Sequence, residues 1–286
     1  MQPKIPIAAI TDEFSPALTE AIPAMKEIGM TAAELRTIDG RNVVDLDREA
    51  LDRIKEALED AELRVVSIAS PLLKCVLPNG PKLDRRFQHD AFASKHAYED
   101  QPRLTERAFT LAKFFGADIV RVFSYWRAEE PKACEEAIVK ALSGLAAAAA
   151  KENLTVALEN EHACNIATAE ETARILALLP HSNMQMVWDP ANAFVAGEDP
   201  FPRGYSLLPK HRIAHVHAKD CHLENGQPVW GPLGTRHVRW KGQIAALLAD
   251  GYSGFISLET HWAGPNGDKL EASRICGWNL RGLASG

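Results

Sequence analysis

Four short apolar runs of the sequence end on side chains that can bind a metal ion or exchange a proton. Leu158-Glu159-Asn160-Glu161-His162 carries two glutamates, and residues 184–189 end on an aspartate. Ile213-Ala214-His215-Val216-His217 ends on a histidine, and residues 255–259 end on a further glutamate. Short apolar runs of this kind are typical of buried β-strands. The sequence therefore predicts several ionisable groups at the ends of strands.

The spacing of these groups indicates that they act together. Successive strand residues point to opposite faces, so three pairs share a face: Glu159 with Glu161, His215 with His217, and Glu259 with His261. Burying several charges around one cavity is costly unless a cation compensates. Two glutamates, an aspartate and a histidine form an oxygen-rich ligand set that suits Mn²⁺, Mg²⁺ or Co²⁺, with Zn²⁺ as a further alternative. The competing interpretation makes the acids ion-pair partners of Arg36, Arg121 and Lys219.

The elements that must position these residues alternate between strand and helix. Strands are expected at residues 5–10, 31–36, 64–70, 118–124, 155–161, 184–189, 213–219 and 255–260. Helices are expected at residues 16–28, 46–61, 103–115, 131–151, 169–179, 240–248 and 270–283, with only a short helix within 196–209. Regular alternation indicates a parallel sheet, and eight such units indicate an α/β fold, the (β/α)8 TIM barrel, as a single domain over residues 1–286. An open doubly wound sheet is the alternative, but no strand is followed by a Gly-x-Gly-x-x-Gly turn.

One connection stands out by its length. Residues 71–102 are longer than a usual loop between a strand and a helix and contain the turn Pro78-Asn79-Gly80-Pro81. Such an insertion is a candidate lid. Within it, Lys95-His96 suits either a substrate contact or a solvated surface.

Composition narrows the class of protein. The chain has 286 residues, 46% of them apolar and 24% charged, which is typical of a globular protein. Its net charge of −6, with acids and bases interspersed, argues against a nucleic-acid partner. No apolar run is long enough to span a membrane, and the first residues lack the apolar core of a signal peptide. Five scattered cysteines without a Cys-x-x-Cys pair predict reduced thiols and a cytoplasmic location.

Four motifs resemble those of a known family in both order and spacing. They are Leu-Glu-Asn-Glu at 158–161, Trp-Asp-Pro-Ala-Asn at 188–192, His-Val-His-Ala-Lys-Asp at 215–220 and Ser-Leu-Glu-Thr-His at 257–261. Together they resemble the sugar phosphate isomerase/epimerase family, the xylose isomerase-like barrel. Its relatives include ketose 3-epimerases, hydroxypyruvate isomerases and inosose dehydratases. The resemblance covers essentially the whole chain.

The resemblance implies one divalent metal ion, with Mn²⁺ expected first, held by Glu159, Asp189, His217 and Glu259. His217 is preferred over His215 because it lies nearer the end of its strand and matches the family's second histidine. The resemblance also implies that Glu159 and Glu259 are catalytic. Glu159 would remove a proton α to a carbonyl, and Glu259 would protonate the other face of the resulting metal-stabilised enediolate.

The implied substrate is a small sugar, keto-sugar or polyol, and the implied reaction is isomerisation or epimerisation. A lyase, either a dehydratase or a deglycosidase of an oxidised sugar, is the alternative use of the same centre. Residues expected to contact substrate are Glu161, Asn192, Lys219, Asp220, His96 and Arg36. The chain departs from the family at Asn192, where the epimerases often have histidine, and it lacks their more distant glutamate after the fifth strand.

Two other functions compete with these enzymes. An endonuclease of the related apurinic-site fold would use several metal ions and a histidine at position 192, and the acidic net charge also disfavours it. A non-catalytic sugar-binding barrel is the other. The sequence leaves the oligomeric state open, with a homo-oligomer among the alternatives.

Overall fold

The predicted (β/α)8 TIM barrel is confirmed by the computed structural model, which describes residues 4–87 and 95–286. Eight parallel strands form a closed barrel. In barrel order they are β1 (Ile7–Ile10), β12 (Ile256–Leu258), β9 (Ile213–Ala218), β8 (Met184–Trp188), β7 (Thr155–Glu159), β6 (Ile119–Val122), β5 (Arg64–Ile68) and β2 (Ala32–Leu35). Each of them overlaps one of the eight strands expected from the sequence.

Helices connect these strands, and two of them begin or end at residues that favour a helix terminus. They are α1 (Leu18–Ile28), α2 (Arg48–Asp60), α3 (Gln101–Phe115), α4 (Glu135–Ala150), α5 (Ala169–Ala177), α6 (Pro190–Val195), α7 (Tyr205–Leu207), α8 (Trp240–Ala249) and α9 (Lys269–Ala284). Helix α1 ends at Gly29, whose φ of 88° is a left-handed conformation that glycine adopts at little cost. Helix α5 begins with a capping box in which Thr168 and Glu171 satisfy each other's backbone N–H groups.

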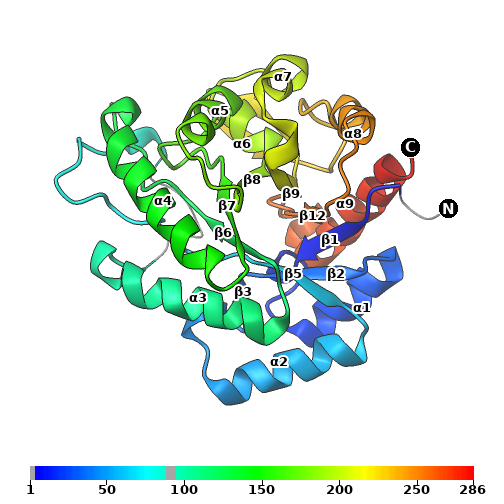
Figure 1. Cartoon of the computed structure of the whole chain (residues 1–286). Coiled ribbons are helices and arrows are strands. Elements are labelled where there is room, and N and C mark those ends of the chain that lie inside the picture. Colours follow the sequence, from blue (N-terminus) through cyan, green and yellow to red (C-terminus); the bar gives the residue numbers. More distant parts are fainter. Residues whose placement is uncertain (1–3, 88–94) are drawn as a thin grey trace. The chain divides into compact units, whose positions relative to one another are not determined.

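The chain divides into two compact units. The first comprises Met1–Ala69, Phe114–Ala117 and His215–Gly286. It contains β12, β1, β2, β5 and residues 215–218 of β9, in the neighbour order β9-β12-β1-β2-β5. Within this unit α1 and α9, from opposite ends of the sequence, lie side by side (Figure 1, blue and red). The beginning and end of the chain therefore share one hydrophobic core.

The second unit comprises Ser70–Lys113 and Asp118–Ala214. It contains the strands β6-β7-β8 in parallel register, with Ala157 of β7 paired to Arg121 of β6 and to Gln185 of β8. Helix α4 packs on β7, and α5 packs on β8 (Figure 1). Trp188, at the end of β8, is fully buried and is among the largest side chains of the core.

The structure adds elements that the sequence did not predict. Two short antiparallel hairpins lie outside the barrel, formed by β3 (Thr37–Ile38) with β4 (Arg41–Asn42) and by β10 (Cys221–Glu224) with β11 (Gln227–Trp230). They are short and partly polar, so they lack the apolar pattern by which buried strands are found.

The long connection predicted over residues 71–102 is only partly described. Its described parts include the 3-10 turns η3 (Arg85–Phe87) and η4 (Tyr98–Asp100), and residues 88–94 lie outside the described residues. Among the helices of the described ranges, none combines the length and the apolar character needed to cross a membrane.

Candidate active site

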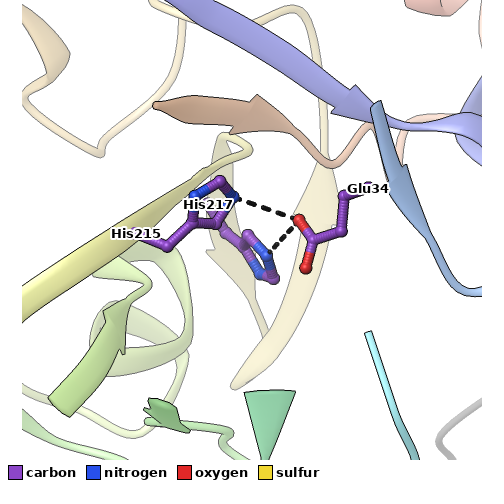
Figure 2. Close-up of side chains that lie close together, drawn as sticks. All are labelled: Glu34, His215 and His217. Carbon is purple, nitrogen blue, oxygen red and sulfur yellow. Dashed lines mark hydrogen bonds and ion pairs between the residues drawn. The ribbon is translucent and has the colours of Figure 1, made fainter. Parts of the chain in front are cut away.

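A carboxylate and two imidazoles meet within the first unit (Figure 2). Glu34 extends from β2, and His215 and His217 extend from one face of β9. Glu34 Oε2 lies 3.1 Å from His215 Nε2 and 3.0 Å from His217 Nε2. Burial alone would raise the pKa of the Glu34 carboxyl, but the two histidines outweigh this and hold the pKa well below its usual range. Glu34 is therefore ionised beside both rings.

Glu259 follows β12 directly and faces positive charge at both carboxylate oxygens. Lys219 Nζ lies 2.6 Å from Oε2, and Arg36 Nη1 lies 3.1 Å from Oε1. Burial alone would raise the pKa of Glu259, but Lys219 and the neighbouring histidines hold it well below the usual range. His217 Nδ1 lies 3.5 Å from Oε2. The structure thus brings two of the predicted metal ligands, His217 and Glu259, together.

Arg36 links several acidic side chains of the first unit. Its guanidinium lies 2.8 Å from Asp12 Oδ2 and 2.6 Å from Glu13 Oε1, in addition to its contact with Glu259. All four side chains are nearly buried, so these charges depend on one another. Arg36, predicted to contact substrate, holds Glu259 in place in the structure.

Asp220, also predicted to contact substrate, is bound to the backbone of the loop that follows β11. Its Oδ2 accepts hydrogen bonds from the N–H groups of Gly234 (2.9 Å) and Arg236 (3.0 Å), and its Oδ1 accepts one from Val238 (3.0 Å). Burial raises the pKa of Asp220, and the backbone donors only partly offset this effect. Asp220 therefore shapes the loop beside Lys219.

His261 forms part of the surroundings of Glu259. Its Nε2 lies 3.4 Å from Glu259 Oε1, and its ring meets the ring of Trp230 edge-on at 4.7 Å between centroids. Lys219 Nζ lies 5.7 Å from the centre of the same Trp230 ring. An aromatic face therefore borders the Lys219–Glu259 pair within this unit.

In the second unit, Glu159 lies at the end of β7 and is almost fully buried. Arg121 Nη1 lies 3.2 Å from its Oε2, and Asn192 Nδ2 donates to its Oε1 at 3.3 Å. Asn192 Oδ1 in turn lies 2.9 Å from His162 Nδ1. Asn192 thus bridges Glu159 and His162.

Asp189 ends β8 and caps the short helix α6. Its Oδ1 accepts a hydrogen bond from Asn192 N at 2.9 Å. The side chain of Asn160 binds the Asp189 backbone, with Nδ2 donating to Asp189 O at 2.7 Å and Oδ1 accepting from Asp189 N at 2.8 Å. This pairing ties the end of β7 to the end of β8. Asn160 was not a predicted site residue.

Glu161 contacts different residues from those that Glu159 contacts. His162 Nδ1 lies 2.8 Å from its Oε1, and Lys74 Nζ lies 3.8 Å from its Oε2. The buried Lys74 ammonium also lies 4.6 Å from the ring centre of Phe123. The sequence prediction missed Lys74, which contacts Glu161. The available signal was its position: it lies shortly after Pro71, which closes the apolar run of β5, and charged residues after strand ends are site candidates.

For His96, also predicted to contact substrate, the described contacts include none with the other predicted site residues. It is half-buried, precedes η4, and lies close enough to Asp100 for their charges to interact. Its predicted role in substrate binding stays a prediction.

The ion pairs of the competing interpretation are present. Lys219 and Arg36 pair with Glu259, and Arg121 pairs with Glu159. These contacts are compatible with metal binding, because an ionised carboxylate has about four lone-pair sites.

The described donors fit a divalent ion by their chemistry. In the first unit, two groups each bring carboxylate oxygens and imidazole nitrogens within 4.8 Å of one another: Glu34 with His215 and His217, and Glu13 with Glu259 and His261. Imidazole and carboxylate donors suit divalent ions from Mg²⁺ to Zn²⁺. A cluster that could hold a divalent metal is therefore part of this unit.

The family model described as "Xylose isomerase-like TIM barrel" matches residues 22–276. The chain belongs to this family. No curated protein matches the chain significantly. Among solved structures, the chain is similar to the IolI protein with a binding zinc atom, at 16% identity and a TM-score of 0.76, covering 98% of both chains.

Two further structures of similar fold are enzymes by name. L-ribulose 3-epimerase has 18% identity and a TM-score of 0.70, with 98% of this chain and 94% of that chain covered. The probable 3-DHS dehydratase AsbF from Bacillus anthracis has 19% identity and a TM-score of 0.69, with 95% and 97% covered. At these identities the likeness establishes the fold of this xylose isomerase-like barrel.

Proposed function

We propose that the protein is a divalent-metal-dependent isomerase or epimerase of a small sugar, keto-sugar or polyol. The observation that carries the proposal is the setting of Glu259, which lies buried beside His217 Nδ1 and is kept ionised by Lys219. A buried, ionised carboxylate next to an imidazole nitrogen is suited both to hold a cation and to exchange a proton.

The proposed metal ligands are Glu159, Asp189, His217 and Glu259. Glu159 ends β7, Asp189 and Glu259 directly follow β8 and β12, and His217 is the last residue but one of β9. These four strands are consecutive in the barrel order. Active sites of TIM barrels are built at the C-terminal ends of the strands, which supports this assignment. We expect Mn²⁺ first, with Mg²⁺, Co²⁺ and Zn²⁺ as alternatives.

The bound ion would supply a positive centre beside the substrate carbonyl, favouring the negative charge that develops when the α-proton leaves. Glu159 accepts that proton in the proposed reaction, while Arg121 and Asn192 hold its carboxylate in place. Glu259 delivers a proton to the opposite face. Glu259 would receive this proton from the Lys219 ammonium, which lies 2.6 Å from its Oε2. The step leaves Glu159 protonated and Lys219 neutral, and proton exchange with water restores both. In the reverse direction the two glutamates exchange roles.

Substrate contacts are proposed for polar groups that border these glutamates. Asn192 contacts Glu159, and Lys219 contacts Glu259. Glu161, two residues after Glu159, contacts Lys74. Arg36, Asp220 and His96 complete the proposed set. In the structure, Arg36 also contacts Glu259, and Asp220 accepts hydrogen bonds from the loop after β11. No nucleic-acid or membrane partner is proposed, and we expect a cytoplasmic enzyme.

A lyase is the second candidate, and the Lys219–Glu259 contact favours it. An ammonium 2.6 Å from the acid–base carboxylate is a proton source for a leaving hydroxyl group. The same α-proton removal by Glu159 would then be followed by elimination of water or of an alcohol instead of reprotonation.

Deuterium exchange separates these reactions. The chelator-treated protein, reloaded in turn with Mn²⁺, Mg²⁺, Co²⁺ and Zn²⁺, is mixed in D2O with a panel of ketoses, aldoses and keto-polyols. An isomerase or epimerase introduces deuterium α to the carbonyl, as read by NMR, without losing water. A lyase produces an unsaturated carbonyl product with a new ultraviolet absorbance. Sugar binding with neither change, under every metal, would overturn the proposal in favour of a binding protein.

A further inference from the structure

The Glu34 carboxylate is buried within the first unit, where a charged group costs free energy unless other groups compensate its charge. Glu34, His215 and His217 are each at most 1% exposed. Strands β1 and β12 separate β2 from β9 in the barrel order, so Glu34 reaches across the curved sheet to both histidines (Figure 2). Three buried polar side chains are tolerated only when they satisfy one another.

The contact geometry fixes which ring nitrogens carry hydrogen. A carboxylate oxygen that two ring nitrogens approach accepts a hydrogen bond from each, and Glu34 Oε2 lies within 3.1 Å of Nε2 of both rings. Both Nε2 atoms therefore donate. In a neutral imidazole the other nitrogen then has the lone pair. For His217 this is Nδ1, which lies 3.5 Å from Glu259 Oε2.

We infer that Glu34 is the positioning residue that presents His217 Nδ1 to the metal ion. The inference rests on the proposed function, which makes His217 and Glu259 ligands of one ion. Metal-binding histidines usually donate their second N–H to a carboxylate or carbonyl, which fixes the tautomer and the ring orientation. Glu34 supplies this carboxylate from β2, which lies two places from β12 and three places from β9 in the barrel order.

His215 supports the same arrangement without being a ligand. Its Nε2 lies 3.1 Å from Glu34 Oε2 and 2.7 Å from Ser257 Oγ. Its ring meets the His217 ring at 90°, with centroids 5.5 Å apart. His215 therefore packs against His217 and restrains the Glu34 oxygen that both rings share.

The rival interpretation is a second metal ion held by Glu34, His215 and His217 themselves, because their donor atoms lie within 4.8 Å of one another. The number of bound ions separates the two. A positioning role predicts one ion per chain, whereas a second site predicts two, one of which Glu34→Gln would remove.

The experiment measures metal binding on the full chain, with Zn²⁺ as the probe in competition with a coloured chelator. Glu34→Gln keeps the shape of the side chain but removes its charge, and we expect its dissociation constant to rise about 10- to 100-fold. Ser257→Ala removes the hydroxyl group beside His215 but no contact of Glu34 with His217, so it should leave the constant unchanged. Thermal unfolding of each metal-free variant checks that it is folded.

A second measurement determines the tautomer of His217 directly. In Zn²⁺-loaded protein labelled with ¹⁵N-histidine, His217 should have hydrogen on Nε2 and none on Nδ1, with Glu34→Leu losing this preference. A His217 ring that bears hydrogen on Nδ1 would overturn the inference, as would two ions per chain.

The outcomes distinguish this inference from the proposed function. If the wild-type protein binds no ion, or if His217→Ala binds as well as the wild type, the proposed function itself fails. If the wild type binds one ion, His217→Ala loses it and Glu34→Gln binds like the wild type, only the positioning role of Glu34 fails.

Discussion

Asn160 binds both backbone polar groups of Asp189, with Nδ2 donating to the carbonyl at 2.7 Å and Oδ1 accepting from the N–H at 2.8 Å. The two residues stand at the ends of neighbouring strands, so one carboxamide sets the relative position of Glu159 and Asp189. Asn160→Leu removes the side-chain acceptor of the Asp189 N–H and one of the donors to the Asp189 carbonyl, which Ala193 N also contacts at 3.3 Å. We expect the free energy of unfolding to fall by about 3 kcal/mol and metal affinity to fall with it, as measured by denaturant titration and chelator competition.

Asn183 provides the matched control for this prediction. Its Nδ2 donates to the carbonyls of Ala146 (2.9 Å) and Leu154 (3.1 Å), just before β8 begins. Asn183→Leu should therefore destabilise the protein while leaving metal affinity unchanged. Equal losses of metal affinity in the two variants would show that Asn160 acts through stability alone.

Arg36 connects three acids, and its removal should be costly. Arg36→Met leaves Asp12, Glu13 and Glu259 without their shared cation in a nearly buried setting. Breaking a buried ion pair by removing one partner costs about 3–5 kcal/mol, and we expect a loss of this size in denaturant unfolding. Arg53→Met, which breaks an exposed pair with Glu49, should have almost no effect because exposed pairs contribute little. Similar effects of the two changes would contradict the prediction.

The Glu198 carboxyl group should make the free energy of unfolding depend on pH. Its carboxylate accepts hydrogen bonds from Ala169 N (2.7 Å) and Glu170 N (3.2 Å) at the start of α5. Burial raises the pKa of Glu198, and the two N–H donors only partly offset this effect. The folded protein therefore holds this proton more tightly than the unfolded chain does. The stabilisation is complete below the unfolded pKa and is lost as the pH rises through the folded pKa.

Glu198→Gln cannot ionise and isolates this contribution. The free energy of unfolding of the wild type minus that of the variant should decrease as the pH rises from about 4, the usual range of a glutamate pKa. Denaturant titrations of both proteins between acid and neutral pH test this. A difference that grows with pH would show that the N–H donors, and not burial, control the carboxyl.

The sequence was sufficient for the barrel because each strand is a short apolar run with a clear boundary. Leu18, Met25 and Ile28 lie on the buried side of α1, and Gly29 ends the helix as expected. The hairpins β3–β4 and β10–β11 were missed because a few partly exposed residues carry no hydrophobic period. Local pattern thus predicts the elements whose faces are buried.

Contacts between side chains were harder to foresee. The Glu34–His215 contact joins residues 181 positions apart, and it depends on the curvature of the four neighbouring strands β2, β1, β12 and β9. Asp220 looked like a substrate contact because it follows a ligand strand, yet its oxygens accept backbone hydrogen bonds from a loop, the first from Gly234, 14 residues later. Strand ends show where charged groups gather, but pairing among them depends on register and loop conformation.

Glu159 and Glu161, which strand alternation predicts on one face, provide the sharpest test of the proposed chemistry. Glu159 contacts Arg121 and Asn192, whereas Glu161 contacts His162 and Lys74. If Glu159 is the base, Glu159→Gln should slow α-deuterium exchange by about 10²- to 10⁴-fold, even at metal concentrations that saturate the variant. Glu161→Gln should mainly raise KM, because it changes a contact and not the proton acceptor. Exchange that survives in Glu159→Gln and disappears in Glu161→Gln would transfer the role of base to Glu161.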